Sequence, residues 1–142
     1  MHIKTLNKQL ANWSVLYVKL HQFHWYVKGP DFFTLHTKFE EFYDEAGAFV
    51  DEIAERILTI GGEPLGTMKD YLEVTCIKEG CCDTCGQSMV KELVADYQLI
   101  IKESRDVICM FEERDDDETA DLFRGKISEL EKTLWMLTAY LG

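Results

Sequence analysis

The amino-acid sequence predicts an all-α protein, a four-helix bundle with one short extra helix in its longest connection. Apolar residues recur at three- and four-residue steps over four long segments, which is the period of a helix with one buried face. Only two prolines and nine glycines interrupt the 142 residues. Because 46% of the residues are hydrophobic, the chain can bury one core, and we expect a single domain over residues 1–142.

The first two predicted helices form an antiparallel hairpin. The segment 5–27 is followed by Gly29-Pro30, and proline disfavours helix at the residue before it, so the chain breaks there. The next helix covers residues 32–60 and ends before Gly61-Gly62, where glycine is the favoured residue. Either Glu52 or Glu55 can form an ion pair with Arg56 on this helix. The apolar stripes of the two helices are Leu6, Leu10, Trp13, Leu16, Leu20 and Phe23, then Leu35, Phe39, Phe42, Ala46, Phe49, Ile53, Ile57 and Ile60.

The second half of the chain contributes the other two long helices. We expect a short helix over residues 67–73 and long helices over residues 87–113 and 118–141. The long connection returns the chain to the opposite end, so the second and third long helices run in the same direction. Asp116 or Asp117 can cap the last helix, and Cys109 reads as a small buried apolar residue.

Five residues have the chemistry and spacing of metal ligands. His24 ends one helix of the hairpin and His36 begins the next, with Glu40 one turn beyond His36. Asp51 and Glu55 are a second i,i+4 pair on the same helix. Asp51 lies 15 residues after His36, which is about 22 Å along the helix axis at 1.5 Å per residue. One helix cannot bring both sets to one metal, so they serve separate sites or a second copy supplies one set.

The angular positions of these ligands favour a second copy. With about 100° per residue, His36, Glu40, Asp51 and Glu55 lie beside the apolar stripe and point away from the chain's own core. A two-fold axis near the middle of the helix would bring two copies together antiparallel, which predicts metal sites shared across a dimer interface. His21, one turn before His24, is either a surface or interface histidine or a further ligand.

The ligand segment resembles a known family. HQFHWYVKGPDFFTLH, FEEFYDE and DEIAERILTIGG are similar to the signature of the Dps family, the mini-ferritins or DNA-binding proteins from starved cells, and the similarity runs from Asn7 to the C-terminus. It implies a ferritin-like bundle, a hollow homododecamer and a ferroxidase whose di-iron ligands are His24, His36, Glu40, Asp51 and Glu55. Relatives often have Asp at the position of Glu40.

The resemblance also implies a reaction and a path for iron. Fe²⁺ would be oxidised, preferentially by hydrogen peroxide and otherwise by dioxygen, and stored as a Fe³⁺ mineral that limits oxidative damage; zinc could replace iron. Asp117 and Asp121 match acidic positions at the family's three-fold pores, with Glu112 a weaker candidate. A ferritin site within one subunit is excluded, because the chain has no Glu-x-x-His and no histidine after His36.

Four cysteines, Cys76, Cys81, Cys82 and Cys85, stand together in the long connection. Cys82 and Cys85 have a C-x-x-C spacing, so the thiolates could bind zinc or another soft ion, or act in redox chemistry. The alternative is a set of incidental surface thiols. The family pattern does not require these cysteines.

The charge and hydropathy of the chain argue against several other functions and locations. The net charge of −11 and the lack of a basic tail predict weak or no direct DNA binding, which disfavours a nucleoid-protecting shell with little iron chemistry. A structural or adhesive shell with decayed metal chemistry is disfavoured by the complete ligand set. No segment has about 20 uninterrupted apolar residues, and the N-terminus lacks the apolar run of a signal peptide, so we expect a cytoplasmic protein without membrane contact.

Overall fold

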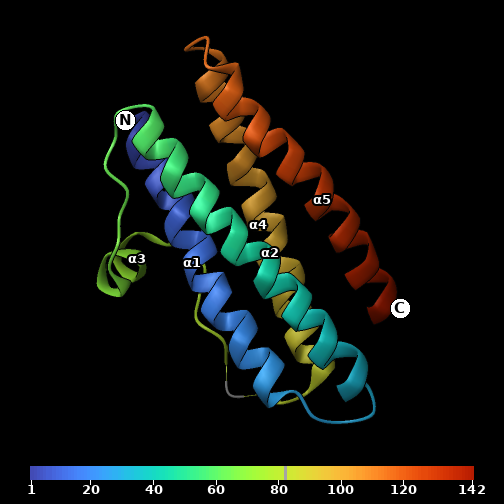
Figure 1. The fold of residues 1–142 in the computed structure, drawn as a ribbon. Helices are drawn as coiled ribbons and strands as arrows, with labels where there is room; N and C mark the ends of the chain where they lie inside the picture. Colours follow the sequence, from blue (N-terminus) through green and yellow to red (C-terminus); the bar gives the residue numbers. More distant parts are fainter. Residues whose placement is uncertain (82) are drawn as a thin grey trace.

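The computed structural model describes residues 1–81 and 83–142 and confirms the all-α bundle. Its helices are α1 (His2–Tyr26), α2 (Phe32–Thr59), α3 (Met68–Val74), α4 (Gly86–Glu112) and α5 (Asp117–Leu141). In Figure 1, α1 and α2 form one antiparallel hairpin, α4 and α5 form another, and α3 lies against α1. As predicted, α2 and α4 run in the same direction. The first helix begins at His2, three residues earlier than expected.

The predicted apolar stripes form the core. Every residue of the α1 stripe is buried, and so is the α2 stripe except for the half-buried Ile60 at its end. Aromatic rings interlock across the helices: Phe49 of α2 meets Trp13 of α1 and Phe123 of α5, edge to face, at centroid distances of 5.1 and 5.5 Å. The prediction of a buried Cys109 was wrong. It lies about 200° around α4 from Val107, and therefore faces solvent.

The end of α2 has the geometry that its two glycines predict. Gly61 has a φ of +86°, which a residue with a side chain rarely adopts. The amide of Gly62 donates to the carbonyl of Ile57 over 2.8 Å, and the amide of Gly61 donates to that of Leu58 over 3.0 Å. This pair of bonds satisfies carbonyls that the helix would otherwise leave free. The helix therefore stops within a few residues of the second acidic pair.

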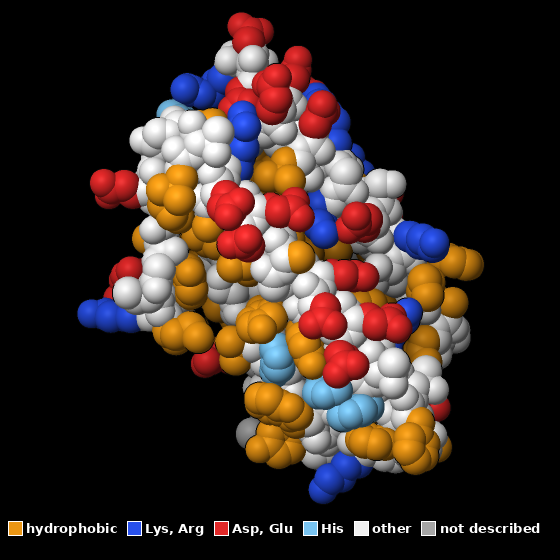
Figure 2. Space-filling model, in the orientation of Figure 1, with side chains coloured by type: hydrophobic (Ala, Val, Ile, Leu, Met, Phe, Trp, Pro, Cys, Tyr) orange, Lys and Arg blue, Asp and Glu red, His pale blue; other side chains and the backbone are white. Residues whose placement is uncertain are grey.

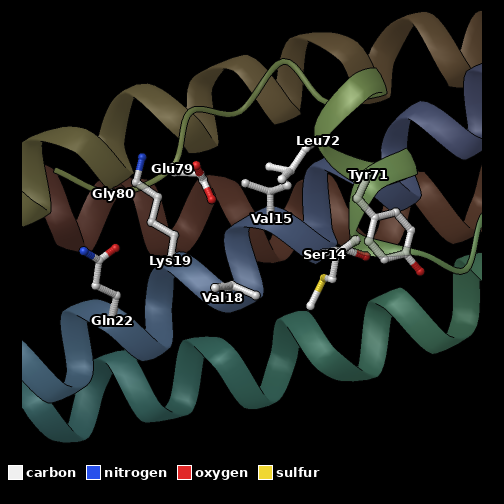
Figure 3. A pocket seen from close by; sticks show the side chains of 10 residues that line it. Ser14, Val15, Val18, Lys19, Gln22, Tyr71, Leu72, Glu79 and Gly80 are labelled. Atoms are coloured by element: carbon white, nitrogen blue, oxygen red, sulfur yellow. The ribbon is translucent and has the colours of Figure 1, made fainter.

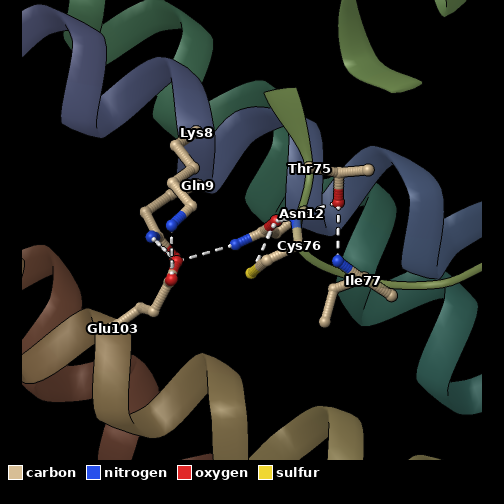
Figure 4. Close-up of polar contacts among 7 residues, drawn as sticks. All are labelled: Lys8, Gln9, Asn12, Thr75, Cys76, Ile77 and Glu103. Atoms are coloured by element: carbon tan, nitrogen blue, oxygen red, sulfur yellow. Dashed lines mark hydrogen bonds and ion pairs between the residues drawn. The ribbon is translucent and has the colours of Figure 1, made fainter. Parts of the chain in front are cut away.

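A polar network fastens the long connection to the bundle (Figure 4). The side-chain oxygen of Asn12 accepts hydrogen bonds from the Cys76 amide and the Thr75 hydroxyl, both over 2.9 Å. The Asn12 amide group in turn donates to Glu103 of α4 over 3.1 Å, and Lys8 pairs with the same carboxylate over 2.6 Å. Because Asn12 is fully buried, losing these partners would leave uncompensated polar groups inside the protein.

An ion pair connects α2 with the turn between α4 and α5. Arg56 contacts Asp116 over 3.0 Å and the Thr119 hydroxyl over 2.8 Å, so the expected pairing with Glu52 or Glu55 was wrong. Asp116 also caps α5, as predicted, by accepting from the Thr119 amide. Burial alone would raise the pKa of Asp116, but the bonds from Thr119 and the charge of Arg56 lower it.

Candidate metal centre

Two histidines hold each other in place where α1 meets α2. Nδ1 of His24 lies 2.6 Å from the carbonyl oxygen of His36, and Nδ1 of His36 lies 2.7 Å from the carbonyl oxygen of His24. A carbonyl can only accept, so Nδ1 carries the proton in both rings. In the neutral imidazole this leaves Nε2 with its lone pair free, the form in which histidine binds metals. The hairpin turn at Gly29-Pro30 makes this reciprocal pairing possible.

Aromatic packing fixes the orientation of the two imidazoles. The rings of His24 and His36 stack with their centroids 3.7 Å apart and 13° between their planes. Phe32 stacks on His36 at 4.9 Å, and Tyr43 meets His24 edge-on at 5.4 Å. His24 is buried and His36 is half-buried, so the pair sits at the surface with limited freedom to turn. Rings held this way lose little conformational entropy on binding a ligand.

Glu40 adds a carboxylate one turn along α2. Its side chain is exposed, and its Oε1 accepts a hydrogen bond from the Tyr43 hydroxyl over 3.2 Å. We call His24, His36 and Glu40 the histidine half-site. Tyr43 was not among the residues predicted from the sequence, although its i+3 position relative to Glu40 is a spacing at which helical side chains meet. His21 does not join the half-site: its Nδ1 bonds the Tyr17 carbonyl over 2.8 Å, and its ring stacks on Tyr43.

Asp51 and Glu55 form the acidic half-site, further along the same helix. Both side chains are exposed, and among the described residues neither makes an ion pair or a side-chain hydrogen bond. Two carboxylates left open on one helix face are available to a cation. Within residues 1–81 and 83–142, no three His, Cys, Asp or Glu side chains of the single subunit are arranged to hold a metal ion. The five predicted ligands therefore do not form a complete metal site within one subunit of the described structure.

The surface around the half-sites combines three kinds of side chain. Figure 2 shows histidines at the surface, with acidic side chains beside them and apolar side chains around them. Among the exposed apolar residues of α1 are Val18, Trp25 and Tyr26, and Trp25 has 66% of its surface accessible. Exposed aromatic residues beside histidine and carboxylate side chains are typical of a surface that another subunit covers.

A separate cleft of about 230 Å³ lies between α1, α3 and the connection that follows α3 (Figure 3). Val18 of α1 and Leu72 of α3 line it, together with the buried Lys19, which pairs with Asp96 over 2.7 Å. None of the five predicted ligands lines this cleft. It is therefore distinct from the candidate metal centre.

Comparison with known proteins identifies the family. The ferritin-like domain family matches residues 3–142. The chain is 52% identical over 140 residues to DNA protection during starvation protein 2 of Bacillus anthracis, covering 99% of this chain and 96% of that protein.

The chain belongs to the Dps family. The crystal structure of Dps from Staphylococcus aureus is 47% identical, covers 99% of this chain and 95% of that one, and superposes with a TM-score of 0.97. Dps from Vibrio cholerae, described as a member of a broad superfamily of ferritin-like diiron-carboxylate proteins, is 37% identical with a TM-score of 0.97, covering 99% and 89% of the two chains. These comparisons confirm the ferritin-like bundle expected from the sequence.

Two of the three acids predicted to line a Dps-type pore pair with one arginine. Arg124 of α5 pairs with Asp121 over 2.5 Å and with Glu112 at the end of α4, while Asp117 is exposed at the start of α5. Arg124 offsets part of the negative charge of this cluster. Asp117 is thus the candidate whose charge is least compensated within the subunit, because neither ion pairs nor side-chain hydrogen bonds engage it in the described part of the chain.

The cysteines of the connection have dissimilar surroundings, and Cys82 lies outside the described residues. Cys76 is half-buried and donates to Asn12, and burial raises the pKa of its thiol. Cys81 is exposed and donates to Glu92 of α4 over 3.1 Å. Cys85 precedes α4, where hydrogen bonds from the amides of Ser88 and Gln87 lower the pKa of its thiol. The zinc hypothesis stays a prediction, and an unchanged zinc content after all four cysteines are replaced by serine would end it.

Proposed function

We propose that this Dps chain is a ferroxidase that binds Fe²⁺ as its substrate, oxidises it and stores the product. The mutual bonds of His24 and His36 carry the proposal, because they leave two Nε2 atoms open at one surface point. Imidazole and carboxylate are ligands that suit Fe²⁺, and the five residues offer both. Zinc prefers the same donors and would compete for the site.

Each site is shared between two subunits. The half-sites are about 22 Å apart along α2, so a single helix cannot present both to one iron site. In an isologous pair with antiparallel α2 helices, the histidine half-site of one subunit faces the acidic half-site of the other, and the arrangement repeats on the other side of the axis. The open carboxylates of Asp51 and Glu55 support this assignment.

The protein's own groups have three tasks in the reaction. His24 and His36 supply neutral nitrogen donors whose orientation the stacked rings maintain. Glu40, Asp51 and Glu55 supply negative charge that balances Fe²⁺ and continues to balance it after one electron leaves. Five donors leave an incomplete coordination shell for two irons, which gives an oxidant access; we propose hydrogen peroxide as the preferred oxidant and dioxygen as the alternative.

Storage requires the assembled shell. We propose a hollow homododecamer in which Asp117 and Asp121 line pores and raise the local concentration of Fe²⁺. Fe³⁺ then collects as a mineral inside, so iron and peroxide are removed together and cannot generate radicals. Within the described residues, no helix combines the length and apolarity needed to cross a bilayer. We place the protein in the cytoplasm.

A shell that protects DNA by direct binding is the second candidate, favoured by the name of the B. anthracis relative. The charge of −11 opposes it, since phosphate binding requires clustered Lys and Arg to release counterions. We therefore expect protection through iron chemistry. Salt-sensitive, stoichiometric retardation of duplex DNA at physiological ionic strength would overturn this expectation.

The decisive experiment is anaerobic loading of the assembled protein with Fe²⁺, followed by hydrogen peroxide, with ferric absorbance as the signal. The comparison is a His36→Ala/Asp51→Ala variant, which loses one ligand from each half-site. Fast oxidation by peroxide in the parent protein and its loss in the variant are expected. Equal rates in the two proteins would refute the assignment and favour a shell without this metal chemistry.

A further inference from the structure

Tyr43 occupies a central place beside the histidine half-site. Its ring stacks on His21 with centroids 3.7 Å apart and 20° between the planes, and it contacts His24 edge-on at 5.4 Å. His21 is itself anchored, because its Nδ1 bonds the Tyr17 carbonyl over 2.8 Å and its ring packs against Tyr17 at 4.5 Å. The phenol ring is therefore held on one face by His21, a histidine that does not join the histidine half-site.

The Tyr43 hydroxyl points from this support to a predicted ligand. It donates to Oε1 of Glu40 over 3.2 Å, and Oε2 of Glu40 has no bonding partner among the residues that the structure describes. A carboxylate oxygen can only accept, so the Tyr43 phenol is the donor in this bond. One carboxylate oxygen is thus engaged, and the other is free for a metal.

A glutamate at this position needs such a partner. Its side chain has one more rotatable bond than aspartate, and an exposed side chain loses that freedom when it binds a metal. A hydrogen bond that restricts the carboxylate before the metal arrives reduces this loss.

We propose that Tyr43, held by His21, is a positioning residue that pre-orients the Glu40 carboxylate for metal binding. The proposal rests on the proposed function, because it assigns Glu40 as a ligand. Tyr43 itself does not touch the metal, and the effect of its hydroxyl is exerted through Glu40 alone. This dependence distinguishes it from a residue that only supports the fold.

The test is a double-mutant cycle with Co²⁺, which binds like Fe²⁺ but is not oxidised under anaerobic conditions. Tyr43→Phe removes one oxygen and keeps the ring on His21. It is compared with Glu40→Asp, with the double variant, and with Tyr71→Phe, a control on α3 that also removes one hydroxyl hydrogen bond, to the Leu65 carbonyl, outside both half-sites. Each assembled protein is titrated with Co²⁺ by its d–d absorption, and the KM for Fe²⁺ and kcat with peroxide are measured separately.

We expect Tyr43→Phe to weaken Co²⁺ binding about three- to tenfold, the range for one ordinary hydrogen bond that water can partly replace, and to raise the KM for Fe²⁺ with little change in kcat. Tyr71→Phe should leave Co²⁺ binding unchanged. In the Glu40→Asp background, where the shorter arm cannot maintain the contact, Tyr43→Phe should have no further effect. Equal losses in both backgrounds, or unchanged affinity and KM, would overturn the proposal.

His36→Ala separates this proposal from the proposed function. If the parent protein shows no His36-dependent Co²⁺ site, the shared metal site itself is wrong. If that site is present and Tyr43→Phe binds Co²⁺ as the parent does, only the role of Tyr43 is refuted.

Discussion

Mixed assemblies can show whether the metal site is shared between subunits. His36→Ala damages the histidine half-site and Asp51→Ala damages the acidic half-site, and these residues are about 22 Å apart on α2. An assembly of either variant alone has one ligand missing from every site. Both pure variants should therefore lose peroxide-driven Fe²⁺ oxidation.

Mixing the two variants restores a calculable fraction of the sites. When equal amounts co-assemble at random, about half of the two-fold pairs contain one copy of each variant. In such a pair, one site combines the two intact half-sites and the other combines the two damaged ones. About a quarter of all sites are then complete, so oxidation should recover to about a quarter of the parent rate.

The assay uses the two variants co-expressed with different affinity tags and purified on both, with the proportions checked by mass spectrometry. Selecting shells that contain both tags leaves the expected fraction near a quarter as long as the overall ratio is equal. The control mixture is His24→Ala with His36→Ala, which damages the same half-site twice and should stay inactive. Full inactivity of the first mixture would refute a shared site. If all ligands of a site came from one subunit, every site in the mixture would contain a damaged residue, and mixing could not restore activity.

The other predictions concern the pore, the α5 cap and the end of α2. Replacing Asp117 and Asp121 by Asn should slow Fe²⁺ uptake by intact shells roughly tenfold at low salt, and stopped-flow rates that do not change would remove the pore assignment. Asp116→Ala removes the cap and the contact with Arg56, and should cost about 1–2 kcal/mol near neutral pH, seen as a lower unfolding temperature. Because the folded state lowers the pKa of Asp116, its ionised form stabilises the protein above the unfolded pKa of about 3.9, and this contribution disappears as the pH falls through the folded pKa. The destabilisation by Asp116→Ala should therefore shrink in acid; a constant difference at all pH values would contradict the assigned charge effect. Gly61→Ala should cost about 1 kcal/mol, because alanine is strained at a φ of +86°, and equal unfolding temperatures would exclude that strain.

The fold class could be predicted correctly from the sequence, which also supplied a candidate ligand set. Helical periodicity follows from local geometry, so spacings of three and four residues identified the buried stripes of α1 and α2. Gly29-Pro30 and Gly61-Gly62 placed the helix ends because their backbone preferences are also local. The ligand assignment of Glu40, Asp51 and Glu55 came from the same rules together with the family resemblance. That assignment and the sharing of the site between subunits both stay predictions.

The non-local partner of each polar group could not be predicted from the sequence, because it depends on how the helices and loops pack. Arg56 has acids beside it on its own helix but binds Asp116, which the turn between α4 and α5 brings next to it. The bonds from each His Nδ1 to the other's carbonyl, and the stacking of Tyr43 on His21, depend on how closely α1 and α2 approach. Periodicity gives the face of a helix on which a residue lies but not the path of the chain opposite that face. Hydrogen bonds act only over about 3 Å, so their partners are settled when the helices and loops pack together.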